Sequence, residues 1–462
     1  MKKLYVIVAC GLLIVGATMC RKPNASVLDD DSKFDPRLSG GLATFMDVES
    51  GSATGPIGGL SERDARVHAF GDKLFEQAFV AAPAPLFGGL GPVYNNVSCA
   101  NCHHNDGFGL PTFGQVGSSL LMRLSVPGED EHGGPVAAPG FGGQLQNVAL
   151  FGVQPEASVD LSYTEQKFTF PDGDTAWLRT PTYVLTNPYM PLPANLLTSP
   201  RLGPTVFGLG LLENVPEETI LSFTDPTDAN NDGIKGRANY VYNPYTKKRE
   251  IGRFGKKSNT SSLLVQVATA FQQDMGLTSY VQPTKSVFGQ PQMSAVPAST
   301  THDLADSALD AVVFYVRTLS VPARRNTTNA LVKRGETIFK QINCSGCHMP
   351  TMYTGVVPGL PALSGQRIHA YTDMLIHDMG DGLADHRPDY LAGGNDWRTP
   401  PLWGIGMFVK TNGVPYYLHD GRARSLKEAI LWHDGEGKRS RDQFVQLPAA
   451  DRQALIAFLN SL

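Results

Sequence analysis

Two short stretches decide the fold: Cys99-Ala-Asn-Cys102-His103 and Cys344-Ser-Gly-Cys347-His348. A Cys-x-x-Cys-His stretch is typical of covalent c-type haem attachment. Two thiols one helical turn apart reach the two vinyl groups of one porphyrin, and the adjacent histidine stands beneath the iron as an axial ligand. The sequence therefore predicts two covalently bound c-type haems, with His103 and His348 as the proximal iron ligands.

Two other interpretations compete for these cysteines. A thioredoxin-like thiol pair also has the Cys-x-x-Cys spacing, and two such pairs can form a four-cysteine zinc site. A histidine follows each pair, and the two pairs lie far apart in the chain, which favours haem. The chain has six cysteines, and the remaining two, Cys10 and Cys20, lie in the N-terminal apolar segment. No disulfide framework is expected.

The composition excludes several classes of protein. The chain has 462 residues, of which 42% are hydrophobic and 18% charged, so it can bury a core and is not expected to be disordered. A net charge of −4 gives no basic footprint for nucleic acid. No apolar run long enough to span a bilayer occurs beyond the N-terminus. The 48 glycines and 33 prolines predict long ordered loops.

The N-terminus predicts export. Two lysines precede an apolar stretch, Leu4–Met19, which is typical of a secretory signal peptide over residues 1–19. Cys20 ends this stretch and resembles the lipid-modified cysteine of bacterial lipoproteins. Residues 20–62 are expected to form a tether. The expected location is the periplasmic face, with the membrane contacted only through the lipid anchor.

A degenerate internal repeat predicts two haem domains. Residues 71–75 (GDKLF) and 335–339 (GETIF) precede the two haem motifs, and residues 304–319 and 449–462 resemble the terminal helix of a cytochrome c domain. Residues 201–221 and 398–431 carry a second matched series, RLGP–FGLG–PEETIL and RTPP–WGIG–LKEAIL. We therefore expect a mainly α fold with two cytochrome c-like domains, 63–325 and 326–462. The first is expected to be enlarged by long loops and a small β element.

The order of these motifs resembles the di-haem oxidoreductase family, whose members are labelled peroxidases or thiol oxidoreductases. The resemblance extends from about Arg66 to Leu462. It is carried by CANCHHNDGFG (99–109), GLGLLENVPEE (208–218), DPTDANNDGIKGR (225–237), IGRFGKK (251–257), AFQQDMGLTS (270–279), WRTPPLWGIG (397–406) and LHDGRARSLKEAILWH (418–433). The family is in turn similar to bacterial di-haem cytochrome c peroxidases.

The resemblance implies an oxidoreductase of peroxidase type. Electrons would enter at one haem from a redox partner protein, a small cytochrome or a cupredoxin, and peroxide or another oxidant would be reduced at the other haem. Two alternatives remain open: a non-enzymatic electron-transfer lipoprotein, which the two Asp-Met-Gly stretches (274–276 and 378–380) favour, and oxidation of a protein or thiol substrate. No catalytic residue is identified from the sequence.

The second axial ligand of each haem is sought among the remaining histidines and methionines. Met379 follows His348 at a suitable distance, and Met275 holds the matching place in the first repeat; a thioether ligand would raise the reduction potential. His377 is the main competitor of Met379, and core packing is the competing role for both methionines. Related peroxidases often carry a methionine directly before the His-Asp-Gly stretch, but this chain has Leu418 there.

Several side chains are expected in the haem pockets. Arg398 and Arg422 suit haem propionates, because a guanidinium matches carboxylate geometry. His419 is expected near a propionate or a distal pocket, with a solvated loop as the alternative. Trp403 would assist electron transfer between the haems if the superfamily pattern holds, and a buried core position is the alternative.

A calcium loop is expected at Asp228-x-Asn230-x-Asp232-Gly233. Oxygen ligands at positions 1, 3 and 5 converge on a hard cation, and the glycine permits the sharp turn. Position 12 is Asn239 in place of the usual glutamate, so the match covers only the first half of an EF-hand loop. A polar turn without metal is the alternative.

Overall fold

A computed structural model describes residues 34–47, 54–84, 86–115 and 117–462. The predicted signal peptide (1–19) and Cys20 lie outside the described residues, as does part of the predicted tether (20–62). Contacts within the chain group Arg37–Leu462 into one unit. In the described part of the chain, no helix has both the length and the apolar character needed to cross a membrane.

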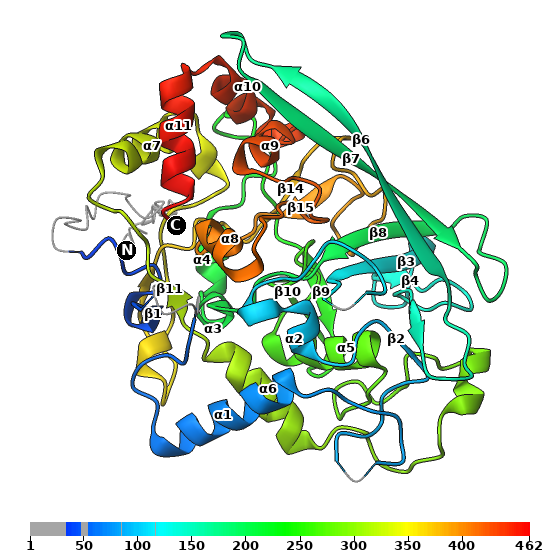
Figure 1. Ribbon diagram of the computed structural model, residues 1–462. Helices are drawn as coiled ribbons and strands as arrows, with labels where there is room; N and C mark the ends of the chain where they lie inside the picture. The colour runs from blue at the N-terminus through cyan, green and yellow to red at the C-terminus, as the bar shows by residue number, and fades with distance from the viewer. Residues whose placement is uncertain (1–33, 48–53, 85, 116) are drawn as a thin grey trace, which may run out of the picture. The chain divides into compact units, whose positions relative to one another are not determined.

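Two pairs of packed helices carry the predicted repeat. The first pair is α1 (Glu62–Glu76) with α6 (Asp306–Arg317), and the second is α7 (Ala330–Gln341) with α11 (Ala449–Leu459) (Figure 1). A glycine allows the close approach in each pair. A Cβ on Gly71 would lie 2.1 Å from the carbonyl oxygen of Ala311, and a Cβ on Gly335 would lie 1.9 Å from that of Ala454. Only glycine fits where two backbones come this close.

This packing predicts a large effect from one methyl group. Gly335→Ala should lower the free energy of unfolding by about 1–3 kcal/mol, because the new Cβ forces α7 away from α11. Gly58→Ala is the control, since a Cβ at Gly58 would meet nothing within 4 Å, and it should change stability by no more than about 0.5 kcal/mol. Denaturant unfolding of the haem-loaded protein measures both. Equal unfolding midpoints for the two variants would contradict the close helix crossing.

The expectation of a mainly α fold is wrong. Helices make up 28% of the structure and strands 20%, the latter in many small sheets. The other helices are α2 (Cys99–Cys102), α3 (Leu209–Glu213), α4 (Glu217–Ser222), α5 (Leu263–Met275), α8 (Phe408–Asn412), α9 (Leu426–Leu431) and α10 (Lys438–Gln446). Much of the strand content lies between the first haem motif and α3, where glycine and proline had suggested loops.

The strands form one three-stranded sheet and several pairs. The sheet has the order β4-β3-β8, from β3 (Leu120–Glu129), β4 (Pro135–Val136) and β8 (Leu197–Leu202). The longer pairs are β6 (Ser158–Thr169) with β7 (Thr175–Thr186), β9 (Tyr240–Asn243) with β10 (Lys248–Ile251), and β14 (Ile376–Asp378) with β15 (Asp396–Arg398). Two-residue pairs join β1 (Thr44–Phe45) to β11 (Val321–Pro322), β2 (Val93–Tyr94) to β5 (Val148–Ala149), and β12 (Met352–Tyr353) to β13 (Arg367–Ile368).

The β6–β7 hairpin explains why the small β element was underestimated. The antiparallel register runs without a break from Ser158↔Thr186 to Thr169↔Thr175. Both strands are rich in threonine, valine and tyrosine, which favour extended backbone. Pro181 lies within β7 opposite Tyr163, and a strand of a two-stranded sheet tolerates the missing N–H on its unpaired edge.

This hairpin packs on the second half of the chain. Phe170 is buried among residues of the C-terminal helices, and the guanidinium of Arg452 lies 4.2 Å from the centre of its ring. At the other end of the contact, Arg179 donates to the carbonyl oxygens of Arg422 (2.9 Å) and Gly421 (3.0 Å). The insertion of the predicted first domain (63–325) therefore covers part of the predicted second domain (326–462). The boundary between the two domains stays a prediction.

The two halves of the repeat also meet directly. A Cβ on Gly208 would lie 2.7 Å from Cζ2 of Trp403, and a Cβ on Gly404 would lie 2.5 Å from Cζ of Phe207. The Trp403 ring thus fills the space beside Gly208, and the Phe207 ring fills the space beside Gly404. Both rings are buried in the larger hydrophobic core, which contains residues of both halves.

Candidate functional site

The first haem motif forms the short helix α2 and the turn after it. Ser98 caps the helix by accepting from the N–H of Asn101 (3.3 Å), and the N–H of His103 donates to the carbonyl oxygen of Cys99 (2.9 Å). His103 Nδ1 lies 2.7 Å from the carbonyl oxygen of Pro204. This contact fixes the ring, and within the described residues Nε2 has no hydrogen-bond partner.

The second motif repeats this arrangement. The N–H of His348 donates to the carbonyl oxygen of Cys344 (2.9 Å), and His348 Nδ1 lies 3.0 Å from the carbonyl oxygen of Tyr371. Burial lowers the pKa of His348 to about 4 and also lowers the pKa of His103. Both imidazoles are therefore neutral at pH 7 and can bind a metal through Nε2, the geometry that a backbone carbonyl at Nδ1 commonly imposes on metal-binding histidines.

The four cysteines of the motifs suit covalent attachment better than the competing roles. None forms a disulfide. Burial raises the pKa of Cys102 and of Cys344 to about 12, and it also raises those of Cys99 and Cys347. Reactive redox thiols have lowered pKa values. Among the described residues, one group of cysteine, histidine and carboxylate side chains lies close enough together to hold a metal ion: Cys347, Asp373 and His377. The two cysteine pairs therefore do not form a four-cysteine metal site.

His377 is held as a charged side chain. Its Nε2 lies 2.8 Å from Asp373 Oδ2, and its Nδ1 lies 2.7 Å from Glu436 Oε2. Burial alone would lower the pKa of His377, but the facing Asp373 outweighs it and raises the pKa well above its usual value. An imidazolium with both nitrogens engaged has no lone pair for a metal. The geometry thus gives no support to His377 as an iron ligand.

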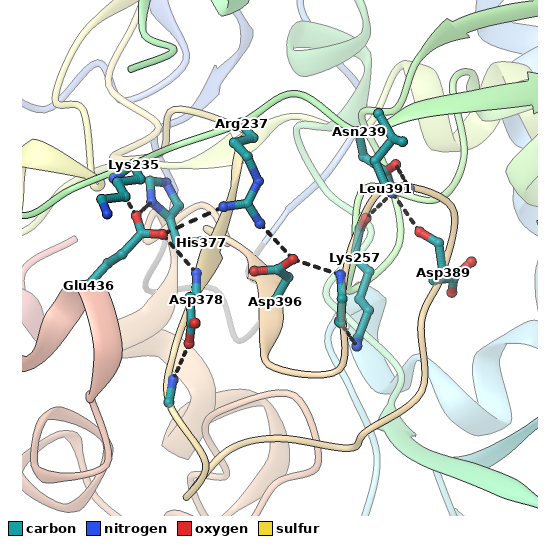
Figure 2. Close-up of polar contacts among 12 residues, drawn as sticks. Lys235, Arg237, Asn239, Lys257, His377, Asp378, Asp389, Leu391, Asp396 and Glu436 are labelled. Atoms are coloured by element: carbon teal, nitrogen blue, oxygen red, sulfur yellow. Dashed lines mark hydrogen bonds and ion pairs between the residues drawn. The ribbon is translucent and has the colours of Figure 1, made fainter. Parts of the chain in front are cut away.

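Figure 2 shows the polar network to which His377 belongs. Glu436 accepts from the backbone N–H of Lys235 (2.7 Å) and of Asp378 (3.0 Å), and Arg237 Nη2 lies 2.7 Å from Asp396 Oδ2. Arg237 comes from the insertion of the first half, whereas Asp378 and Asp396 lie in β14 and β15. The network therefore fixes the β14–β15 hairpin and the turn at Glu436 around the second haem motif.

A second part of the network holds a buried cation. Lys257 Nζ is fully buried and lies 2.7 Å from Asp385 Oδ1, and it donates to the carbonyl oxygens of Arg387 (2.9 Å) and Gly393 (2.7 Å). Burial lowers the pKa of Lys257 to about 8, so the ammonium group is still charged at pH 7.

Two neighbouring cations have unused donors, which suits haem propionates. Arg398 donates its backbone N–H to the carbonyl oxygen of Lys256 (2.8 Å), and its buried Nη1 has no partner. Burial and the adjacent Arg398 lower the pKa of Lys256 to about 7, and no hydrogen bond to its Nζ is found in the described residues. Two positive charges held close together in a partly desolvated place are stabilised by a nearby anion. These residues therefore fit a group that carries carboxylates.

Arg422 and His419 have partners of their own. Arg422 Nη2 lies 2.9 Å from Asp420 Oδ2, and Arg422 Nη1 donates to the carbonyl oxygen of Gly382 (2.6 Å). The His419 ring stacks on Trp397 with centroids 3.7 Å apart, and burial lowers its pKa to about 3. Their roles at a propionate or a distal pocket stay predictions without added support. Trp403 is buried at the contact between the halves, and its Nε1 has no partner.

The two predicted methionine ligands differ in their surroundings. Met275 is 2% exposed and belongs to the larger hydrophobic core. Met379 is partly exposed, and its methyl group lies 3.5 Å from where a Cβ of Gly437 would be. Ligation by either methionine stays a prediction.

The predicted calcium loop forms a compact polar turn. Asp228 Oδ1 accepts from the N–H of Gly233 (3.1 Å), Asn230 Oδ1 from that of Asp232 (2.9 Å), and Asp232 Oδ1 from that of Ile234 (2.9 Å). These bonds account for one side-chain oxygen of each predicted ligand. Calcium binding stays a prediction.

Two residues of this region were missed from the sequence. Lys256 lies within the family-like stretch IGRFGKK (251–257), but nothing in the local pattern reveals that its half-buried side chain lies beside Arg398. His433 follows α9 and belongs to no ligand motif in the sequence; the structure brings its ring to 6.5 Å from that of His348, between ring centroids.

Comparison with known proteins gives one family and one solved structure. A family model described as "Di-haem oxidoreductase, putative peroxidase" matches residues 34–462. No curated protein sequence matches the chain. Hydrazine synthase from Kuenenia stuttgartiensis, solved under xenon pressure, is 20% identical with a TM-score of 0.25, covering 35% of this chain and 57% of the other. The match thus spans little more than half the length of that chain.

Proposed function

Because this chain belongs to the di-haem oxidoreductase family, we propose that it is an exported di-haem c-type cytochrome of the peroxidase type. Electrons from a small cytochrome or a cupredoxin enter at one haem, and peroxide or another oxidant is reduced at the other. The haems, when bound, supply one-electron transfer and an iron at which peroxide can be cleaved.

The arrangement of His103 and His348 carries this proposal. Each imidazole directly follows a Cys-x-x-Cys pair, is neutral, and has its Nδ1 at a backbone carbonyl oxygen, 2.7 Å away for His103 and 3.0 Å for His348. In each motif the two thiols would bind the porphyrin and the free Nε2 would bind the iron. The same geometry in both halves supports a matched pair of haem sites.

The residues around these motifs bind and orient the haems. Lys256 and Arg398 would neutralise propionates with their unused donors, since each lies half-buried near the other without a carboxylate of its own in hydrogen-bond contact. Trp403, buried where the two halves meet, provides an aromatic ring for electron transfer between them.

The proposal extends to the location of the protein. A signal peptide over residues 1–19 and a lipid on Cys20 would hold the chain at the periplasmic face through a tether, where the partner proteins of c-type cytochromes occur. Calcium at Asp228, Asn230 and Asp232 would stabilise the loop beside the turn at Glu436. The second candidate function is electron transfer without catalysis, which the repeated Asp-Met-Gly stretches favour, because a methionine on each iron would close both sites.

Peroxide turnover tests the proposed function. The haem-loaded protein is mixed with a reduced small c-type cytochrome, and oxidation of that donor is followed with and without hydrogen peroxide. We expect oxidation that depends on both the protein and the peroxide. Rapid electron exchange with the donor but no dependence on peroxide would favour the electron carrier.

A further inference from the structure

We propose that His433 is the second axial ligand of the haem attached at Cys344 and Cys347, which makes this haem six-coordinate with two histidines. The inference deepens the proposed function and rests on it, because it requires a haem iron on His348. It replaces Met379 in that role.

The spacing of the two rings fits two ligands on one iron. The ring centroids of His348 and His433 lie 6.5 Å apart, and the ring planes are inclined by 51°. Metal–imidazole bonds of about 2.0–2.1 Å, with each centroid roughly 1.2 Å behind its ligating nitrogen, give a separation of about 6.5 Å.

Both rings have the hydrogen bonds of metal-binding histidines. His433 Nδ1 lies 2.8 Å from the carbonyl oxygen of Ala429, one turn earlier in α9, and His348 Nδ1 lies 3.0 Å from that of Tyr371. No hydrogen-bond partner for Nε2 of either ring is found in the described part of the chain. A carbonyl oxygen at Nδ1 leaves Nε2 of each ring as the nitrogen available to iron.

The backbone that carries His433 is fixed by the polar network of Figure 2. Glu436, three residues later, is bound by the backbone N–H groups of Lys235 and Asp378 and by the His377 ring. At Gly435 a Cβ would lie 2.3 Å from the carbonyl oxygen of Asp378, so the turn packs closely on β14. The His433 ring is therefore held in place before iron binds, as a rigid ligand requires.

Among the described residues of the first half, no histidine ring contacts His103 in the way that His433 contacts His348. Phe75 lies 6.0 Å from His103 and Phe339 lies 6.3 Å from His348, between ring centroids, so one phenylalanine contact is common to both halves. The contact of His433 is additional, and the matched series PEETIL and LKEAIL places Phe223 where the second half has His433. A phenylalanine cannot bind iron. Two histidines would thus close the second haem as the electron-entry site.

Met379 is the competing ligand and lies close by. A Cβ placed on Gly437 would lie 3.5 Å from the methyl carbon of Met379 and 3.2 Å from Cδ2 of His433. The two side chains therefore share one side of that turn. A thioether and an imidazole give ferric haem different spectra, so the two assignments are distinguishable in the intact protein.

The test combines spectra of the wild type with three variants. Near-infrared magnetic circular dichroism and EPR of the oxidised holoprotein should show one low-spin haem with two nitrogen ligands. His433→Ala should convert that haem to a high-spin signal, and added imidazole should restore the low-spin signal, which a merely structural histidine would not allow. His433→Met should instead give a sulfur-to-iron charge-transfer band and a higher reduction potential. Met379→Leu should leave the wild-type spectra unchanged.

Opposite results overturn the inference. They are a sulfur-to-iron band in the wild type that disappears in Met379→Leu, loss of the low-spin signal in Met379→Leu, or an unchanged low-spin signal in His433→Ala. The wild-type spectrum alone decides the assignment if the alanine variant fails to fold. Failure of the proposed function is seen separately, because donor oxidation would then not depend on peroxide, while the spectra would still report the ligands of the second haem.

Discussion

Replacing both cysteines of one motif with serine should remove one of two covalent haems from each chain. Cys344→Ser with Cys347→Ser leaves only the first haem, and Cys99→Ser with Cys102→Ser leaves only the second. The reason is that serine forms no thioether with a vinyl group, whereas each motif binds its own porphyrin. Intact mass under denaturing conditions, together with the pyridine haemochrome, counts the haems that remain.

His104→Ala is the matched control for this experiment. His104 directly follows the first motif, and its side chain is exposed, so this variant should keep both haems. Covalent haem that persists at two per chain in either double-serine variant would contradict the assignment of that motif. Loss of both haems from one double variant would show that the two sites do not load independently.

The second large effect concerns the buried ion pair between Lys257 and Asp385. Lys257→Met should lower the free energy of unfolding by about 3–5 kcal/mol, because it leaves Asp385 buried without its counter-ion. Lys257 is 0% and Asp385 1% exposed, so water cannot replace the lost ammonium group. The variant also loses two backbone carbonyl contacts of Lys257 Nζ.

Denaturant unfolding of the holoprotein measures this effect. Lys248→Met, at an exposed position of β10, is the control and should stay within about 0.5 kcal/mol of the wild type. Adding Asp385→Leu to Lys257→Met should recover part of the loss, since the double variant buries no lone charge. Equal stability of Lys257→Met and Lys248→Met would mean that the pair is solvated.

Local patterns in the sequence predict the parts of the fold whose contacts are close in the chain. Helical spacing of apolar residues in 304–319 and 449–462 corresponds to α6 and α11. The haem motifs likewise predict a short helical turn followed by a histidine, and the structure has this turn at both places.

Contacts between distant segments explain what was missed. The β6–β7 hairpin is stabilised by partners far along the chain, such as Glu428, which accepts from the backbone N–H of Arg179 (2.8 Å). Its own strand-forming sequence does not reveal that it covers the C-terminal helices. The position of His433 depends in the same way on the bonds of Glu436 to Lys235 and Asp378, which no local pattern encodes.

The most direct test of a peroxidase-type di-haem protein is EPR of the haem-loaded wild type, first fully oxidised and then half-reduced. We predict a low-spin signal from the haem on His348 and, in at least one of the two states, a high-spin ferric signal from the haem on His103, whose sixth position is open or weakly held. Two low-spin signals that persist through half-reduction would contradict the account and leave an electron carrier.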